Sequence, residues 1–351
     1  MMEKNNIPQV PPGMKKILPF WAAAVLFAAL GLILLHANSI RLIHYIEYPE
    51  TNPLVLAETY REEAEKLYKK AAGKFASMKS DPSAHQTMKQ LPELAKSRRL
   101  FLECLKIKPN MKGIYPFLSD LAAFEGDKAS LFFYKGKQAI MEKQWETATL
   151  AFDESLKHQP DYQPSLKSKI FALLEAGKLE TAEKTMNRLF DSFSSLGKQA
   201  DAETYYIQSR IASRKKDPEQ QKEALAKAVA TDPAHAGAAK NLAAILVAKK
   251  EFDQAATVLQ NALSGASEDA HLLHLLGQIL MMKGDYSGAR DSLEKALKIE
   301  KNSAPLYFDL AKVYEKLGKK SNSTVMLQKA IGIDPRFKNR ILFPENEKNT
   351  K

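Results

Sequence analysis

His271 and His274, one helical turn apart, come nearest to a metal-binding pair in this sequence of 351 residues. A zinc site needs further ligands, and only Asp269 and His235 could supply them from nearby positions. Because this falls short of a clear ligand set, the pattern favours a solvated or partner-contacting surface. We therefore expect no metal site and no cofactor.

No other pattern in the sequence points to catalysis. The chain contains no phosphate-binding glycine loop, no His-Glu-x-x-His motif and no nucleophile elbow. Its single cysteine, Cys104, excludes an intramolecular disulfide, provides no zinc framework and is expected to be a small buried residue. We predict a protein that is not an enzyme and has no catalytic residues.

A repeat of 34 residues organises most of the chain. Leu242, Leu276 and Leu310 are spaced 34 residues apart, and so are Ala148 and Ala182. The frame predicts six units covering residues 129–335, which start near Ala129, Gln163, Ala202, Ala236, Ala270 and Ala304. The step from the second unit to the third is 39 residues, and the additional residues fit the polar loop near 191–199.

Each unit is predicted to form two helices joined by a turn. In the unit that starts at Ala270, Leu273, Leu276 and Leu280 recur at helical spacing, and Gly284 then breaks the helix. Small residues, as close helix packing requires, return at one place in the units: Gly136, Ser209, Ala243, Gly277 and Ala311. These features predict an all-α protein built of helix hairpins.

The last unit carries a pattern that resembles the tetratricopeptide repeat family. The residues that match are Tyr307, Leu310, Ala311, Tyr314, Ser323, Leu327, Ala330 and Pro335. The resemblance implies a right-handed α-solenoid whose first helices line a concave, protein-binding groove. Some positions depart from the family pattern: Lys301 and Ser267 replace the closing proline, and Gln208 and Gln221 stand where Leu and Ala are usual.

A single transmembrane helix is predicted in front of the repeats. Residues 17–37 include no Asp, Glu, Lys or Arg, and 21 such residues are enough to span a bilayer. A cleaved signal peptide is the alternative, although its apolar region is usually only about 7–15 residues long. Lys15 and Lys16 precede the segment, so the positive-inside rule places residues 1–16 in the cytoplasm. We expect a bacterial inner-membrane protein with periplasmic repeats.

The two segments that flank the repeats have separate predictions. Residues 44–128 are expected to be a helical linker with degenerate repeat-like helices that cap the array, and a separate small domain is the alternative. Residues 336–351 are expected to form a short cap and a polar tail. Because no full capping helix follows the last unit, its exposed apolar face predicts possible homo-oligomer formation through the C-terminal end.

The net charge of +11 is spread along the chain. Residues 1–128 hold 18 Lys and Arg against 13 Asp and Glu, and residues 129–351 hold 34 against 28. Because no basic patch stands out and no aromatic stacking platform is interleaved with basic residues, we expect no nucleic-acid partner.

Side chains on first helices that miss the core stripe form the predicted protein-binding groove. They are Tyr134, Lys137, Lys167, Phe171, Tyr206, Arg210, Arg214, Lys240, His274, Gln278, Met281, Met282, Phe308 and Lys312. Basic groups mixed with aromatic and methionine contacts suit an acidic or amphipathic peptide. The leading hypothesis is a membrane-anchored scaffold that assembles or chaperones envelope proteins. The alternative is an accessory subunit that positions an envelope enzyme, such as a transferase or a protease.

The predicted topology has a direct test. Full-length protein should remain in the membrane after carbonate or high-salt washing, because an apolar helix leaves a bilayer only at high cost. Protease added from the non-cytoplasmic side should digest the repeats. Release of a soluble chain that starts near Asn38 would show instead that residues 17–37 are a cleaved signal.

Overall fold

The regular secondary structure of the described chain is entirely helical. The computed structural model describes residues 53–77, 91–111, 113–265 and 269–339. Within these ranges every regular element is a helix, which confirms the predicted all-α class. The predicted segments 1–16 and 17–37 lie outside the described residues. Among the helices that are described, none is both long and apolar enough to cross a membrane.

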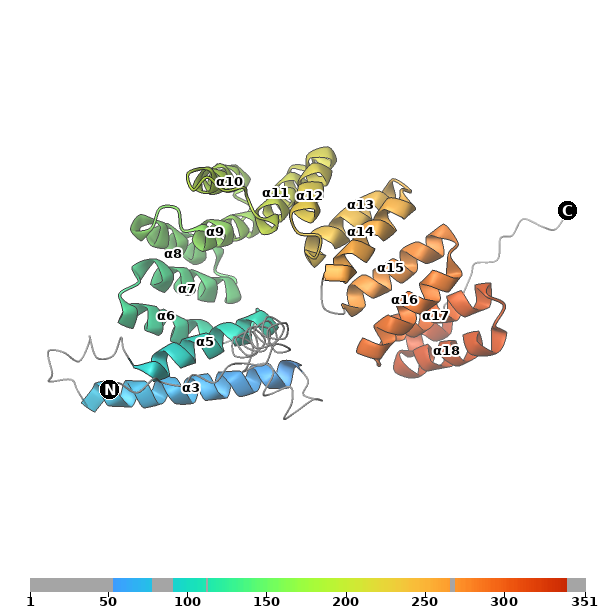
Figure 1. The fold of residues 1–351 in the computed structure, drawn as a ribbon, viewed down its shortest axis with the longest axis horizontal. Helices are drawn as coiled ribbons and strands as arrows, with labels where there is room; N and C mark the ends of the chain where they lie inside the picture. Colours follow the sequence, from blue (N-terminus) through green and yellow to red (C-terminus); the bar gives the residue numbers. More distant parts are fainter. Residues whose placement is uncertain (1–52, 78–90, 112, 266–268, 340–351) are drawn as a thin grey trace, which may run out of the picture. The chain divides into compact units, whose positions relative to one another are not determined.

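The chain divides into two compact units, Met1–Leu118 and Ser119–Lys351. In the first unit, α3 (Pro53–Ser77) packs against α5 (Pro92–Ile107), and the boundary between the units falls within α6 (Ile114–Glu125) (Figure 1). An ion pair of 2.7 Å between Lys74 Nζ and Glu93 Oε1 joins α3 to α5. The hydrogen bond with Lys74 is the main cause that lowers the pKa of Glu93 to about 2.

Cys104 is fully buried between α3 and α5, as the sequence predicts. Its Sγ donates a hydrogen bond to the carbonyl oxygen of Ala57 over 3.2 Å, which ties α5 to α3. Burial raises the pKa of the thiol to about 11, because a charged thiolate is poorly solvated there. The cysteine is therefore an unreactive packing residue.

The second unit is a succession of helix pairs, visible in Figure 1 from green to red. The pairs are α7 (Lys128–Met141) with α8 (Trp145–His158), α9 (Gln163–Glu175) with α10 (Leu179–Ser194), α11 (Ala202–Lys215) with α12 (Pro218–Thr231), α13 (Ala236–Ala248) with α14 (Phe252–Gly265), α15 (Ala270–Lys283) with α16 (Tyr286–Ile299), and α17 (Ala304–Lys316) with α18 (Lys320–Ile333). A short 3₁₀ helix, η2 (Pro335–Asn339), follows. The odd-numbered members from α7 to α17 are the first helices, and the even-numbered members are the second helices.

The turn inside each pair depends on backbone conformation. Helix α15 ends at Gly284, whose φ of 88° is left-handed and suits glycine. Asp285 then caps α16, because its side chain accepts a hydrogen bond from the backbone N–H of Gly288. Lys216 and Lys250 take the same left-handed conformation with φ of 60° and 61°, which costs a non-glycine residue about 1–2 kcal/mol.

Small residues let the two helices of a pair approach closely. A Cβ atom on Gly277 of α15 would lie 2.8 Å from Cγ of Leu293 on α16, well inside van der Waals contact. A Cβ on Gly136 of α7 would lie 2.5 Å from the ring of Phe152 on α8. The glycines that the repeat frame predicts at this position are therefore required by packing within the pair.

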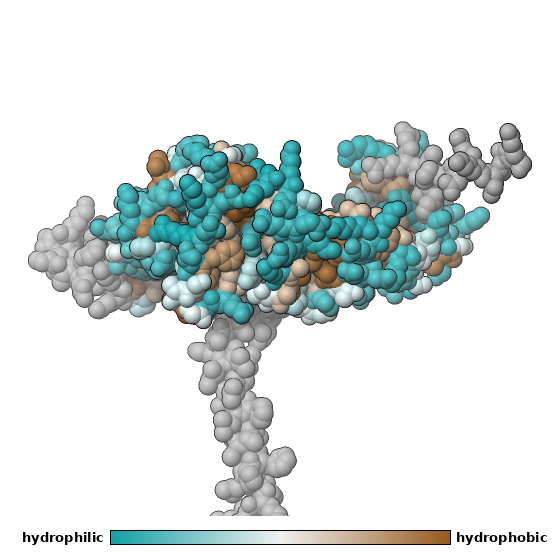
Figure 2. Space-filling model, turned by 90° about the horizontal axis from the view of Figure 1, so that it is seen from above, coloured by the Kyte–Doolittle hydropathy of each residue, from teal (hydrophilic) through white to brown (hydrophobic). Residues whose placement is uncertain are grey.

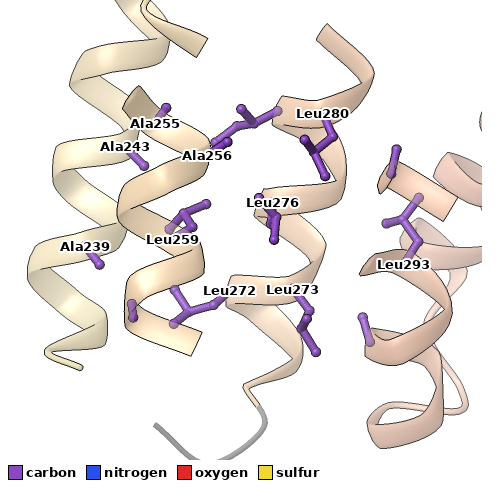
Figure 3. Close-up of a cluster of buried hydrophobic side chains, with 14 of the residues drawn as sticks. Ala239, Ala243, Ala255, Ala256, Leu259, Leu272, Leu273, Leu276, Leu280 and Leu293 are labelled. Carbon is purple, nitrogen blue, oxygen red and sulfur yellow. The ribbon is translucent and has the colours of Figure 1, made fainter. Parts of the chain in front are cut away.

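Apolar contacts continue from each pair to the next. One buried cluster runs from Leu225 of α12 to Tyr314 of α17. Figure 3 shows part of it, with α15 lying between α14 and α16 and Leu272 near Leu259 of α14. The leucines that define the repeat, Leu242, Leu276 and Leu310, are 4%, 5% and 2% exposed. Each pair thus completes the core of its neighbours, as in a solenoid.

Replacement of Gly277 by alanine should destabilise the array by about 1–3 kcal/mol, because the new methyl group overlaps the buried Leu293 side chain. The urea midpoint of the full chain would measure this loss. Gly332 in α18 is the matched control, since nothing lies within 4 Å of a Cβ placed there. Gly332→Ala should be neutral or stabilising by up to about 1 kcal/mol. An unchanged midpoint for Gly277→Ala would contradict the packing argument.

Candidate functional site

The first helices lie next to one another in the second unit. Helix α9 contacts both α7 and α11, and α15 contacts both α13 and α17. All the predicted groove residues lie on these helices: Tyr134 and Lys137 on α7, Lys167 and Phe171 on α9, Tyr206, Arg210 and Arg214 on α11, Lys240 on α13, His274, Gln278, Met281 and Met282 on α15, and Phe308 and Lys312 on α17. We call the accessible surface that these residues form the first-helix face.

Two of the predicted residues are buried instead of lining this face. Tyr134 is 7% exposed and Phe308 is 4% exposed. The ring of Phe308 packs at 5.0 Å from the ring of Phe337 in η2, so the last pair uses it as core. The prediction that these two rings contact a partner is therefore corrected, because both are packing residues. By contrast, Met282 is 58% exposed and is available to a partner.

A pocket of about 220 Å³ opens on the first-helix face at α11. Its lining residues are Tyr206, Ser209, Arg210, Ser213 and Arg214 from α11, Gln221 from α12 and Asn241 from α13. We call it the arginine pocket. Guanidinium, amide and hydroxyl groups together bind carboxylate or carbonyl oxygen well. Its volume is below the usual range for cofactor sites, so it suits a single side chain.

One carboxylate holds both arginines of this pocket. Oε1 of Glu175, the last residue of α9, lies 3.3 Å from Nη2 of Arg210 and 3.1 Å from Nη2 of Arg214. Arg210 also lies over the ring of Phe171, 4.9 Å from the ring centroid. Two cations against one anion leave the pocket with a net positive charge, and the stacking orients one guanidinium.

Other basic residues pair with acids of a neighbouring unit. Lys167 Nζ lies 2.6 Å from Oδ2 of Asp201, and His235 Nε2 lies 3.0 Å from Oε2 of Glu203. Burial alone would raise the pKa of Asp201, but hydrogen bonds from Lys167 and Thr204 outweigh it and lower that pKa. The hydrogen bond with Glu203 is the main cause that raises the pKa of His235. These pairs join consecutive units.

His274 belongs to a polar cluster around a buried acid on α17. Its Nε2–H donates to Oδ2 of Asp309 over 2.8 Å, and Gln278 Nε2 donates to the same oxygen over 2.8 Å. Lys312 Nζ reaches Oδ1 at 3.3 Å. Burial of Asp309 tends to raise its pKa, yet the hydrogen bonds from His274 and Gln278 outweigh burial and lower it.

The geometry separates the two histidines that are one turn apart. His271 is exposed at the start of α15, whereas His274 is engaged by Asp309. In the part of the chain that the structure describes, no three His, Cys, Asp or Glu side chains come close enough to hold a metal ion.

Lys137 of the first-helix face is largely enclosed by its neighbours. Burial lowers the pKa of its amine, because a charged ammonium group is poorly solvated there.

Sequence analysis missed the acids of this face. Glu175, Asp201 and Asp309 each hold a predicted cation of another unit, and none was singled out from the sequence. The signal was available for one pair, since Lys167 and Asp201 are 34 residues apart and therefore occupy equivalent places on neighbouring first helices. Periodicity of opposite charges at the repeat length would have revealed it.

Comparison with protein families identifies the helix pairs. A tetratricopeptide repeat model matches residues 202–235 and 304–337, and a TPR repeat model matches residues 277–318. Residues 202–235 and 277–337 match tetratricopeptide repeats. The matches span α11 with α12 and the region from within α15 to η2. The other pairs stay repeat units by prediction, and so do the predicted domain boundaries.

Several solved structures are similar to this chain. A chain of the APC/C hetero-tetramer Cut9–Hcn1 matches with 18% identity and a TM-score of 0.47 over 76% of this chain and 56% of that chain. Pseudomonas aeruginosa pilF matches with 12% identity and a TM-score of 0.49 over 60% of this chain and 93% of that chain. The C-terminal part of a TPR repeat-containing protein from Cytophaga hutchinsonii matches with 15% identity and a TM-score of 0.48 over 58% and 80% of the two chains. No curated protein sequence matches at a significant level.

Replacement of Asp309 by asparagine should lower the free energy of unfolding by about 1.5–3 kcal/mol at pH 7, because charged hydrogen bonds to a buried group are lost. A carboxyl group with a lowered pKa stabilises the fold above its unfolded pKa of about 3.9, and this contribution disappears as the pH falls through the folded pKa. Urea titrations between pH 7 and pH 3 should show wild type and variant converging on the acid side. A pH-independent difference would contradict the assignment.

Proposed function

We propose that the chain is a membrane-anchored tetratricopeptide scaffold that holds a protein partner on its first-helix face, in the assembly or chaperoning of envelope proteins. The observation that carries the proposal is the arginine pocket, which presents Arg210, Arg214 and Asn241 from adjacent first helices. Tetratricopeptide repeats typically serve as non-catalytic interaction scaffolds, which favours binding over a reaction at this place.

The preferred partner is an acidic or amphipathic peptide segment. The arginine pocket keeps a net positive charge after Glu175 is counted, and each guanidinium has donors that this one carboxylate leaves unused. Phe171 and Tyr206 lie beside the pocket and offer apolar ring surface. A peptide with a carboxylate next to an apolar side chain would pair the carboxylate with the guanidinium groups and pack the apolar side chain against these rings.

Figure 2 shows one face of the molecule. On this face hydrophilic residues predominate, and hydrophobic residues form small, separate patches.

The anchor is proposed from the sequence of residues 17–37. This run has no Asp, Glu, Lys or Arg, and the lysines before it favour a cytoplasmic N-terminus. The repeats would then face the periplasm of a bacterium. A scaffold fixed in this way keeps its partner close to the membrane surface, where envelope proteins emerge.

The C-terminal end is a proposed site of self-association. Only Ser323 and Ala330 of α18 are buried, while Val325 and Ile333 are 46% and 37% exposed. Phe337 covers part of the end of the array, and residues 340–351 of the predicted cap and tail lie outside the described residues. Sedimentation of wild type and Val325→Lys tests this proposal, because a monomer at high concentration in both would exclude it.

The function is tested by binding of a short fluorescent peptide of alternating glutamate and leucine. Arg210→Gln with Arg214→Gln should weaken binding by about ten- to a hundredfold, because two charge-assisted contacts are lost. Affinity should also depend less on salt, while helicity measured by circular dichroism stays unchanged.

The matched control is Arg290→Gln on α16, a second helix, where the arginine pairs with Asp291 at 2.6 Å. This variant should bind within about twofold of wild type. Equal binding of the peptide by wild type and the double variant would move the site away from the arginine pocket. Equal binding of a glutamine–leucine peptide would show that charge is not recognised.

A further inference from the structure

A second cavity, of about 290 Å³, lies among α10, α11 and α12. Its lining residues are Glu183, Met186, Asn187 and Phe190 from α10, Gln208 and Ile211 from α11, and Gln220 from α12. We call it the glutamine cavity. It shares no lining residue with the arginine pocket, so α11 contributes different side chains to two separate openings.

The glutamine cavity differs in its lining from the equivalent opening of about 400 Å³ among α14, α15 and α16, where Leu276 stands in place of Gln208. Gln208 occupies the position that is Leu242, Leu276 and Leu310 in the next three pairs. Each of these leucines is nearly fully buried, and Figure 3 shows Leu276 on the side of α15 that faces α14. A glutamine cannot fill that place cheaply, because its amide would lose water without gaining a partner. Gln208 therefore stays half-buried beside an open space.

The lining of the glutamine cavity combines an apolar floor with a rim of amides. Met186 and Ile211 form buried parts of the floor, at 4% and 3% exposure. The amides of Asn187, Gln208 and Gln220 make no side-chain hydrogen bond to any residue that the structure describes. Each can donate and accept at once, as a peptide group does.

The charge of the glutamine cavity is close to neutral. Glu183 is its only charged lining residue, and Oε1 of Glu183 lies 2.6 Å from Nζ of Lys215. An ionic group placed in the cavity would lose water and find no free counter-charge. The lining thus selects an uncharged ligand, in contrast to the arginine pocket.

We propose that the glutamine cavity binds an extended, uncharged peptide segment of a partner protein, with one aliphatic or methionine side chain on the floor. The backbone N–H and C=O groups of that segment pair with the amides of Asn187, Gln208 and Gln220. The volume is at the low end for small-molecule sites, which fits one or two side chains. This site is separate from the proposed acidic-peptide site.

The proposal explains why the third pair keeps two glutamines where leucine and alanine are usual. Gln208 lines the glutamine cavity, and Gln221 lines the arginine pocket. Both residues therefore place an amide group at an opening of this pair. Because α11 borders both openings, one partner chain with an acidic and an apolar stretch could occupy both.

The test uses full-length protein in lipid nanodiscs with isotope-labelled isoleucine and methionine methyl groups. The probe is N-acetyl-leucine N-methylamide, which has one aliphatic side chain between two peptide groups. Saturable shifts of the Ile211 and Met186 methyl signals are expected. Gln208→Leu, which introduces the residue of the next three pairs, should weaken binding at least tenfold and raise the melting temperature.

Gln254→Leu is the matched control, because Gln254 is the equivalent of Gln220 in the next pair, is exposed and lines no part of the glutamine cavity. It should bind the probe as wild type does. Asn187→Ala, an exposed change on α10, should weaken binding about two- to fivefold without affecting the fold. Absence of saturable shifts in wild type, or equal affinity in wild type and Gln208→Leu, overturns the proposal.

Discussion

Close contact between the two helices of a pair is the constraint on which the repeat region depends. A glycine on the first helix meets a large buried side chain on the second, as Gly277 meets Leu293 and Gly136 meets Phe152. This contact places the leucines of the first helix where the preceding second helix can cover them. Stability then comes from neighbouring pairs, because no single pair can bury its own apolar surface.

The same stacking places first helices beside one another and so determines which of their charged side chains form ion pairs. Cations on one first helix meet acids of the neighbouring unit, as Lys167 meets Asp201 and Arg210 meets Glu175. Half-exposed ion pairs of this type stabilise a protein by about 1 kcal/mol or less. Their larger effect is to hold long side chains in place. A partner therefore meets oriented guanidinium groups that are only partly neutralised.

In the third pair, an amide side chain stands at a core position of the repeat and lines an opening. Where the next pairs have a buried leucine, Gln208 places an amide in a cavity with an apolar floor. Tight cores leave no space for a ligand, and a site needs both space and unsatisfied polar groups. The two departures from the repeat pattern in this pair, Gln208 and Gln221, thus line the glutamine cavity and the arginine pocket.

The sequence by itself determined the helical class, the repeat length and the small positions, because these depend on local periodicity and on side-chain size. Gly284 ends a first helix by its own backbone preference, and the leucine spacing defines the buried stripe without further information. Only the tertiary structure decided which cations are paired and which aromatic rings are buried. Phe308 is covered by Phe337 of η2, and Asp309 collects donors from two first helices, since such contacts depend on how neighbouring pairs stack.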